Sequence, residues 1–358
     1  MVKYKAAIVG LGRIGNLFDR DIKIKNKPVT HAGCYELCDA VELVAGCDIN
    51  QKRLDEFKLD RNVTNLYLNY KEMLDNEEID ILSICTHNDS HRDICLYACE
   101  KKVKAIFCEK PMATTLKECD EMIESCKRNN VLLVIDHTRR FDKSFTVAKD
   151  LLEAGEIGEL QKIDSYATVG LLNGGSHLFD LLRFYVGDAA WVSGKIVPDE
   201  TTDPGAYGII GFKNGVHATV DCRWRDYCYF KVDLAGLRGI LRIGGMIRSN
   251  KNIELLKLEK SEGESGIFEL KEVPLDNKIE STSPYLSAVR SIINHLDNGE
   301  ANVLSGYDGK AALEIAMAFH ESNKFGGHVR IELPLKNLDY KVLARETSFT
   351  KDGRLPRY

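Results

Sequence analysis

The chain has 358 residues, of which 44% are hydrophobic and 29% are charged. This composition is typical of a globular protein with a sizeable core, and the length favours two domains. The net charge of −5 argues against a nucleic-acid-binding surface spread over the protein, and no apolar run reaches the roughly 18 residues of a membrane helix. The basic N-terminus soon runs into glycines, which indicates a first strand rather than a signal peptide. We therefore expect a cytoplasmic protein that binds neither nucleic acid nor membrane.

Eleven cysteines are scattered through the predicted strands and helices. An odd count in a long chain indicates reduced thiols rather than a disulfide framework. Cys34 and Cys38 are four residues apart, as are Cys95 and Cys99, so each pair can share one face of a helix. No CxxC pair occurs. We therefore expect buried thiols that behave as small apolar residues, and no metal site.

Apolar, β-rich runs alternate with helix-like segments over the first 140 residues. Strands are predicted at Ala6–Val9, Val41–Cys47, Ile79–Cys85, Val103–Cys108 and Val131–Asp136. Helices are predicted at Ser90–Cys99 and Thr115–Arg128, and the second opens with the capping-box spacing of Thr115 and Glu118. Near-continuous apolar strands between helices predict a parallel sheet that is covered on both faces, as in a doubly wound Rossmann domain.

The first strand runs into GLGRIG, a GxGxxG motif that follows a strand and opens a predicted helix. Gly10 permits the tight turn, Gly12 lets the backbone approach a pyrophosphate, and Gly15 allows close packing of helix and strand. Arg13 and Ile14 complete a turn whose N–H groups can face the phosphates. These five residues are the predicted dinucleotide-binding turn.

The acidic residue that should bind the cofactor ribose is displaced. The motif expects it about 20 residues on, whereas Asp48 follows Gly15 by 33 residues, and the nearer Glu36 precedes the second strand. The polar segment DRDIKIKNKP, residues 19–28, resembles an insertion in the first crossover. Asp48 stands at the end of the second strand, where a ribose would lie, although it could instead cap the loop.

Asp48 also bears on the choice between the two nicotinamide cofactors. A carboxylate at this strand end accepts hydrogen bonds from ribose hydroxyls and repels a 2′-phosphate. NAD is therefore favoured over NADP. Lys52 and Arg53 follow closely enough to keep NADP open.

Polar clusters follow three later strands, at the edge where open parallel sheets bind ligands. Thr86, Asn88, His91, Glu109 and Lys110 are the candidate cofactor contacts among them. Arg139 is a candidate substrate contact, although it could equally form a salt bridge. Lys110 lies between an acid and a proline at a strand end, which makes it a candidate for chemistry. Solvation is the simpler interpretation of such a lysine taken by itself.

The stretch LLNGGSHLFD places His177 behind two glycines and four residues after Asn173. Histidine has a pKa near 6.5 and suits proton transfer near neutral pH. His177 alone would more often be structural, but behind a nucleotide motif and Lys110 it is the best acid–base candidate. Asn173 cannot take a proton, so we expect it to orient the substrate or His177. Asp180 is expected to be structural.

After residue 140 the predicted strands follow one another without helices between them. They lie at Leu160–Thr168, Ala189–Ile196, Ala206–Phe212, His217–Arg223, Tyr229–Ala235 and Ile240–Ile243. This pattern predicts an α+β domain with a large, mostly antiparallel sheet. A late helix is predicted at Tyr307–Glu321, capped by Ser305 and Asp308. The predicted domains are therefore 1–140, which binds NAD(P), and 141–358, which binds substrate and mediates self-association.

Taken in order, GLGRIG, CEKP near residue 110 and NGGSHLFD near residue 175 resemble the Gfo/Idh/MocA oxidoreductases. HTRRF, EAGEIGEL and SGYDGKAALEIAMAFHES extend the resemblance over nearly the whole chain. It implies an NAD(P)-dependent enzyme acting on sugars, cyclitols or sugar nucleotides, with Lys110 catalytic, His177 as general acid/base and a cis peptide before Pro111. Many members carry aspartate where this chain has Asn173, and some that act on sugar nucleotides have asparagine. The resemblance also implies a homodimer or homotetramer formed through the second domain's sheet.

The leading hypothesis is an NAD-dependent dehydrogenase or reductase acting on a secondary alcohol or ketone of a sugar, cyclitol or sugar derivative. One alternative is a glycosidase or lyase that oxidises its sugar transiently and releases no net NADH. Another is a non-catalytic NAD-binding sensor, against which the presence of both Lys110 and His177 argues.

Overall fold

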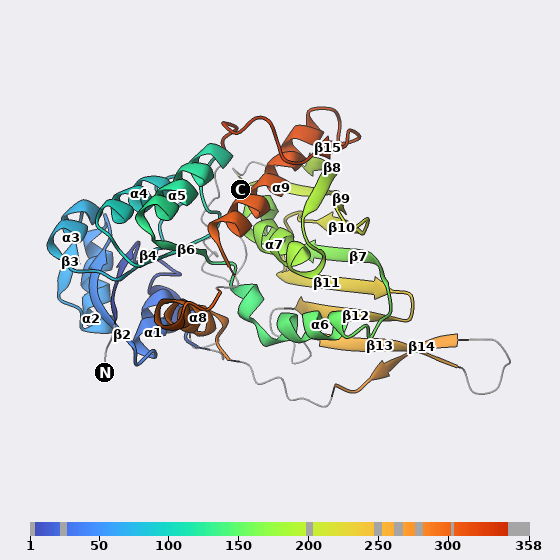
Figure 1. The fold of residues 1–358 in the computed structure, drawn as a ribbon, viewed down its shortest axis with the longest axis horizontal. Helices are drawn as coiled ribbons and strands as arrows, with labels where there is room; N and C mark the ends of the chain where they lie inside the picture. The colour runs from blue at the N-terminus through green and yellow to red at the C-terminus, as the bar shows by residue number, and fades with distance from the viewer. Residues whose placement is uncertain are drawn as a thin grey trace. The chain divides into compact units, whose positions relative to one another are not determined.

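The computed structural model describes residues 4–21, 27–197, 203–246, 253–260, 268–275, 282–301 and 304–342 (Figure 1). The chain forms two compact units. The first comprises Met1–Asp142 and Ser281–Lys310, and the second comprises Lys143–Glu280 and Ala311–Tyr358. The predicted division at residue 140 lies two residues from the first boundary, but it assigns residues 281–310 to the second domain. The structure groups them with the first unit, because a helix there packs into the first unit's core.

Six described strands form the sheet of the first unit in the order β3-β2-β1-β4-β5-β6. All neighbouring pairs are parallel, which confirms the predicted Rossmann sheet. The strands are β1 (Tyr4–Val9), β2 (Val41–Cys47), β3 (Asn65–Tyr67), β4 (Ile81–Ile84), β5 (Ala105–Cys108) and β6 (Leu132–Ile135). β3 was not predicted, because its three residues are partly exposed and show no apolar run.

Helices cover both faces of this sheet (Figure 1). They are α1 (His31–Glu36), α2 (Gln51–Arg61), α3 (Tyr70–Asn76), α4 (His91–Glu100), α5 (Leu116–Asn129) and α8 (Pro284–Asn298), with 3-10 turns η1 (Leu17–Arg20) and η2 (Thr138–Phe141). The predicted capping box is confirmed: Glu118 N–H donates to Thr115 Oγ1 over 3.0 Å, and Thr115 N–H donates to the Glu118 carboxylate over 3.2 Å. α8 was missed, although its buried residues recur at helical spacing: Ala288, Val289, Ile292 and Ile293.

Nine described strands form the second unit's sheet in the order β14-β13-β12-β11-β7-β10-β9-β8-β15. The strands are β7 (Leu160–Ala167), β8 (Ala189–Val197), β9 (Gly205–Phe212), β10 (His217–Asp221), β11 (Tyr229–Gly236), β12 (Gly239–Met246), β13 (Ile253–Lys260), β14 (Phe268–Val273) and β15 (Ile331–Glu332). Among the described pairs only β7 and β10 are parallel, so the predicted antiparallel sheet is confirmed. β13 was not predicted, and neither was β14, whose side chains are almost all exposed.

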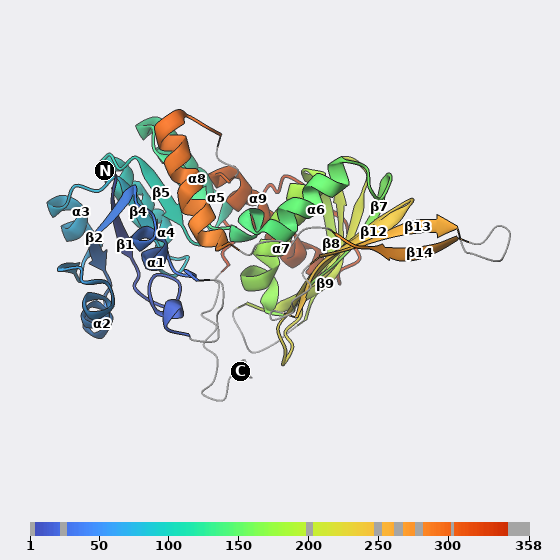
Figure 2. The same cartoon turned by 90° about the horizontal axis from the view of Figure 1, so that it is seen from below.

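Helices α6 (Lys143–Glu153) and α7 (Gly175–Val186) lie along one side of this sheet (Figure 2). The late helix α9 (Gly306–Asn323) begins where predicted, with Ser305 N–H donating to Asp308 over 3.0 Å. Its Phe319 ring fills the space beside Gly194 and Gly208, where any Cβ atom would clash with the ring. No helix in the described ranges is long and apolar enough to span a bilayer.

Candidate active site

The glycine turn after β1 requires glycine at two positions. Gly10 has φ of +94°, and a Cβ there would lie 2.6 Å from the carbonyl carbon of Cys85. A Cβ on Gly15 would lie 2.1 Å from the Gly10 oxygen. At Gly12, by contrast, only side-chain atoms of Arg53 come within 4 Å of a Cβ position. The end of an arginine can swing aside, so the backbone at Gly12 forms a cradle that a phosphate group fits.

The helix expected after this turn is interrupted. The segment turns through η1, and α1 begins only at His31. The N–H groups of His31 and Ala32 then donate to the carbonyls of Ile14 and Gly15, over 3.0 Å each. Donor and acceptor are 17 residues apart in the sequence, whereas they are four residues apart in an α-helix. Thirteen residues are therefore looped out of an otherwise continuous helical hydrogen-bond pattern.

The looped-out residues explain the displaced acid. Without those thirteen residues, the 33 that separate Gly15 from Asp48 become 20, the spacing the nucleotide motif requires. Asp19 anchors the far end of the loop by accepting from Val29 N–H over 2.8 Å and from Arg61 over 3.1 Å. The predicted insertion at residues 19–28 agrees with this loop, although residues 22–26 lie outside the described part.

Asp48 lies at the carboxyl end of β2 and is buried. Its Oδ2 accepts from Leu11 N–H in the glycine turn over 2.8 Å, and its Oδ1 accepts from Asn50 N–H over 2.9 Å. Arg53 Nη1 lies 3.6 Å from Oδ2. The carboxylate therefore orders the turn as well as offering an acceptor to a ribose. Its charge is partly offset by Arg53.

Two of the three candidate side chains after β4 contact backbone carbonyl groups. Asn88 is buried and donates from Nδ2 to the Ala113 carbonyl over 3.0 Å. His91 is buried with its ring nitrogens 2.9 Å from the Thr86 carbonyl and 3.2 Å from the Met112 carbonyl. Burial lowers the pKa of His91, and a neutral imidazole donates from one nitrogen only, so it can bond one of these two carbonyls. The half-buried Thr86 accepts from Ser90 Oγ over 2.7 Å.

A buried cluster of ionisable side chains lies at the ends of β5 and β6. His31 Nε2 is 3.3 Å from both Glu109 Oε1 and Asp136 Oδ2, and its Nδ1 is 2.8 Å from Ser83 Oγ. Ser83 in turn meets Tyr35 Oη over 2.6 Å. Asp136 is 1% exposed. Three ionisable groups thus share one buried space directly before Lys110.

The charges of this cluster follow from burial and mutual contact. Burial, reinforced by the Glu109 charge, raises the pKa of Asp136 to about 7. Burial opposes ionisation of Glu109 too, but contact with His31 and the Lys110 charge outweigh it and lower the pKa of Glu109. Burial alone would lower the pKa of His31, yet its partners Cys85, Asp136 and Glu109 raise it. An imidazolium therefore stands between one ionised carboxylate and one that titrates near neutrality.

Lys110 is the second residue after β5 and is half-buried, and its backbone N–H donates to Glu109 Oε2 over 3.2 Å. The Lys110–Pro111 bond is cis, as the family resemblance implied. After β6, burial, together with the Arg140 and Lys110 charges, lowers the pKa of His137 to about 3. Arg139 is half-buried, and burial lowers the pKa of its guanidinium.

In the second unit, a single π-helical turn at Gly170–Gly174 precedes α7 and contains Asn173. The buried carboxylate of Asp203 holds this turn: Oδ1 accepts from Leu172 N–H over 2.7 Å and Oδ2 from Asn173 N–H over 2.8 Å. Gly170 has φ of +87°, and a Cβ there would lie 2.6 Å from Asp203 Oδ2. Trp224 closes the arrangement by donating from Nε1 to the Asp203 carbonyl over 2.7 Å.

His177 lies in the first turn of α7 and is 9% exposed, whereas Asn173 is half-buried. The stretch is therefore both a glycine turn and a helix start, and it sets a histidine at the edge of the buried core. Asp180 is fully buried further along α7, as a structural residue would be.

Sequence reasoning missed three residues of these arrangements. Asp136 carried a signal, because acids that end two neighbouring parallel strands must meet. His31 and Asp203 carried none, since each reaches its partners from a distant part of the chain.

The parallel sheet with helices on both faces and the glycine turn after β1 define a dinucleotide-binding Rossmann fold. The model of the Gfo/Idh/MocA family, described as an oxidoreductase family with an NAD-binding Rossmann fold, matches residues 4–137. Myo-inositol 2-dehydrogenase of Thermotoga maritima is 27% identical over 92% of this chain and 98% of its own. The resemblance to the Gfo/Idh/MocA oxidoreductases is thereby confirmed over residues 4–137, and the relative that matches nearly the whole chain is a dehydrogenase.

Solved structures share the fold over nearly the whole chain. A myo-inositol 2-dehydrogenase from Lactobacillus plantarum has a TM-score of 0.70 at 22% identity and covers 92% of this chain and 99% of its own. The WlbA dehydrogenase from Bordetella pertussis, in complex with NADH and UDP-GlcNAcA, has a TM-score of 0.75 at 19% identity. It covers 93% of this chain and 100% of its own.

Proposed function

We propose that the protein uses NAD to interconvert a secondary alcohol and a ketone on a sugar, a cyclitol or a sugar derivative such as a sugar nucleotide. The observation that carries the proposal is Lys110, which follows β5 at the carboxyl edge of the NAD-binding sheet. Ligands of open parallel sheets bind at this edge. The buried His31, Glu109 and Asp136 behind it fix the end of the strand.

Each proposed catalytic residue has a separate task. Bound NAD supplies a hydride acceptor for the alcohol carbon. Lys110 donates a hydrogen bond to the reacting oxygen and stabilises the developing alkoxide charge. His177 takes the hydroxyl proton during oxidation and returns it during reduction. Asn173 donates to one substrate oxygen and accepts from another, so it orients without exchanging a proton.

The cofactor residues are proposed from the glycine turn and the strand ends. Gly10, Gly12, Arg13, Ile14 and Gly15 cradle the pyrophosphate. Asp48 accepts from the adenosine ribose, which favours NAD over NADP even though Arg53 lies 3.6 Å away. The remaining proposed contacts are Thr86, Asn88, His91, Glu109 and Lys110, with Arg139 on the substrate side.

Each of the two units is given its own role in the proposed reaction. The first unit is proposed to bind NAD, and the second to supply the substrate contacts through Asn173 and His177. The relatives named above include inositol dehydrogenases and a dehydrogenase crystallised with UDP-GlcNAcA, which supports cyclitols and sugar nucleotides as substrates.

The test is a panel of sugars, inositols and sugar nucleotides with NAD⁺ and NADP⁺ in parallel, read by formation of reduced cofactor. Lys110→Ala and His177→Ala should each lower kcat/KM at least about a hundredfold. Lys104→Ala and His217→Ala are matched controls, because both residues are exposed and lie outside the proposed site. Turnover like that of the wild type in both site variants would refute the catalytic assignment. Glycoside cleavage without net NADH would favour the lyase alternative.

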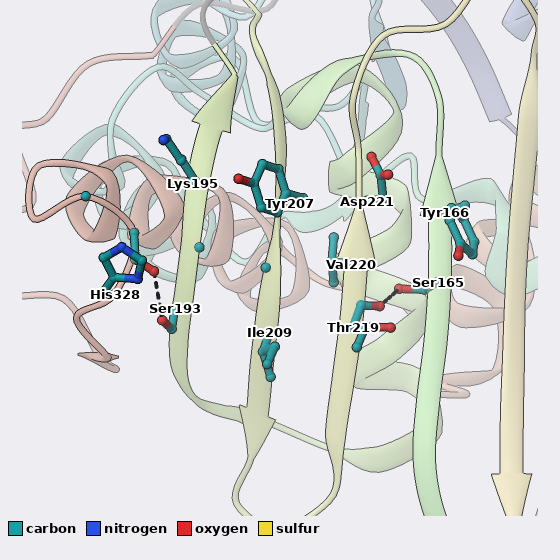
Figure 3. A pocket seen from close by; sticks show the side chains of 14 residues that line it. Ser165, Tyr166, Ser193, Lys195, Tyr207, Ile209, Thr219, Val220, Asp221 and His328 are labelled. Atoms are coloured by element: carbon teal, nitrogen blue, oxygen red, sulfur yellow. Dashed lines mark hydrogen bonds between the residues drawn. The ribbon is translucent and has the colours of Figure 1, made fainter.

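We also propose that the open face of the nine-stranded sheet joins two copies of the chain. Residues of β7, β8, β9 and β10 line a hollow of about 470 Å³ on this face, among them Tyr166, Tyr207 and Ile209 (Figure 3). These three side chains are each 41–43% exposed. Exposed aromatic and aliphatic side chains gathered on one face are typical of association surfaces. Ile209→Lys should lower the mass measured by light scattering, whereas Tyr307→Lys, on α9, should not. An unchanged mass would place the interface elsewhere.

A further inference from the structure

Three cysteine thiols meet between two helices of the first unit. Cys95 and Cys99 lie one turn apart on α4, and Cys126 lies on α5, which packs against α4. Cys126 Sγ is 3.6 Å from Cys95 Sγ and 3.5 Å from Cys99 Sγ, and all three sulfurs lie within 4.8 Å of one another. The three residues are at most 2% exposed. The structure thus adds a third thiol to the i, i+4 pair visible in the sequence.

The spacing distinguishes a metal ion from a disulfide. A disulfide would require two sulfurs to close from 3.5 Å to about 2.0 Å. An ion at the centre of three sulfurs, each about 2.3 Å away, requires sulfurs about 4.0 Å apart. The two separations that involve Cys126 lie about 0.5 Å below that value, and the Cys95–Cys99 separation is at most 4.8 Å. The triangle is therefore closer to a trigonal ligand set than to a cross-link.

The donor set selects the kind of ion. Thiolates prefer soft ions, and zinc and iron–sulfur centres normally take four protein or water ligands. No fourth histidine, cysteine or acidic donor joins these three among the described residues. Monovalent copper is soft and is stable with three thiolates. We propose that Cys95, Cys99 and Cys126 form a trigonal binding site for Cu(I).

Binding at this site is an exchange of protons for a metal ion. One Cu⁺ enters, up to three thiol protons leave to solvent, and neither copper nor sulfur changes its oxidation state. The proposal is independent of the proposed dehydrogenase function, since the three thiols are not among the residues assigned to NAD or substrate.

The experiment presents the purified, reduced full-length protein with the bicinchoninate complex of Cu(I) under anaerobic conditions. The wild type should remove one equivalent of copper, and X-ray absorption should show three sulfur neighbours at about 2.3 Å. Cys126→Ser should weaken binding at least about a hundredfold, since losing even an outer-shell partner costs up to that much. Cys119→Ser is the matched control, because Cys119 is equally buried on the same helix but outside the triangle.

Three outcomes would overturn the proposal: equal copper retention by wild type and Cys126→Ser, tighter binding of Zn²⁺ than of Cu(I), or a mass loss of two protons that shows a disulfide. Because Cys126→Ser could disturb the α4–α5 packing, Cys95→Ser and Cys99→Ser are titrated beside it, with melting curves for each. Folded variants that still bind one equivalent also contradict the site. Loss of copper binding in a folded variant whose NADH production is unchanged supports it.

Discussion

Asp203 offers the sharpest test of how the second unit holds its proposed catalytic turn. Its two oxygens accept from the consecutive N–H groups of Leu172 and Asn173 over 2.7 and 2.8 Å, in a fully buried space. Asp203→Asn keeps the shape but replaces one acceptor oxygen by an NH₂ group. One of the two N–H groups then faces a donor and loses its partner.

An unsatisfied buried N–H costs about 1–3 kcal/mol. For a unit of this size each kcal/mol lowers the melting temperature by about 2–4 °C, so Asp203→Asn should melt about 2–12 °C lower. On the proposed function, kcat should fall as Asn173 moves, while the KM for NAD should stay the same.

Differential scanning calorimetry and initial-rate kinetics measure the two effects. The matched control is Asp188→Asn, because Asp188 forms exposed ion pairs with Arg183 and Lys213 over 2.9 and 3.0 Å. Such pairs contribute at most about 1 kcal/mol. If Asp203→Asn melts with the wild type, the carboxylate does not hold the turn. If it melts lower but turns over normally, the turn is structural and not catalytic.

Three further predictions concern charge. Between about pH 4 and 7 native Asp136, with its pKa raised to about 7, holds a proton that the unfolded chain has lost. Its contribution to stability therefore falls as pH rises through that window, and Asp136→Asn should gain up to about 4 kcal/mol relative to wild type by pH 7. Asn173→Asp places a carboxylate near His177, which favours the imidazolium and should move alcohol oxidation to higher pH. Asp48→Asn should narrow the NAD over NADP preference about tenfold, the effect of roughly 1.4 kcal/mol.

Each of these has a measurement that can contradict it. Urea titrations of wild type and Asp136→Asn are compared at pH 5 and pH 7.5. The difference between their free energies of unfolding should be larger at pH 7.5. An equal difference at both pH values would mean that Asp136 titrates normally. The pH profile of kcat/KM should not shift downward in Asn173→Asp. For Asp48→Asn, kcat/KM ratios for the two cofactors are compared with those of Arg53→Met. Removing the positive charge of Arg53 should raise the preference for NAD, whereas Asp48→Asn should lower it. A change of the NAD to NADP ratio in the same direction in both variants would contradict the charge argument.

Most of the fold could be predicted because the patterns of apolar residues that indicate strands and helices span only a few neighbouring residues. The apolar strands β1, β2, β4, β5 and β6, and the capping box of Thr115, depend on neighbours within a few residues. β14 was missed because its side chains face solvent, and the grouping of α8 with the first unit depends on contacts with segments far earlier in the chain. The candidate site divides in the same way. Lys110 and His177 stand in recognisable motifs. His31, which contacts Glu109, and Asp203, which binds the backbone of Asn173, come from distant segments.

The looped-out segment before α1 changes how the nucleotide motif should be measured. His31 continues, by hydrogen bonding, the helix that Ile14 and Gly15 begin. The spacing between Gly15 and Asp48 should therefore be counted along the hydrogen-bonded helix, without the looped-out residues, and not along the chain. A search that counts residues would select Glu36 or reject the motif. A search that follows backbone connectivity arrives at Asp48.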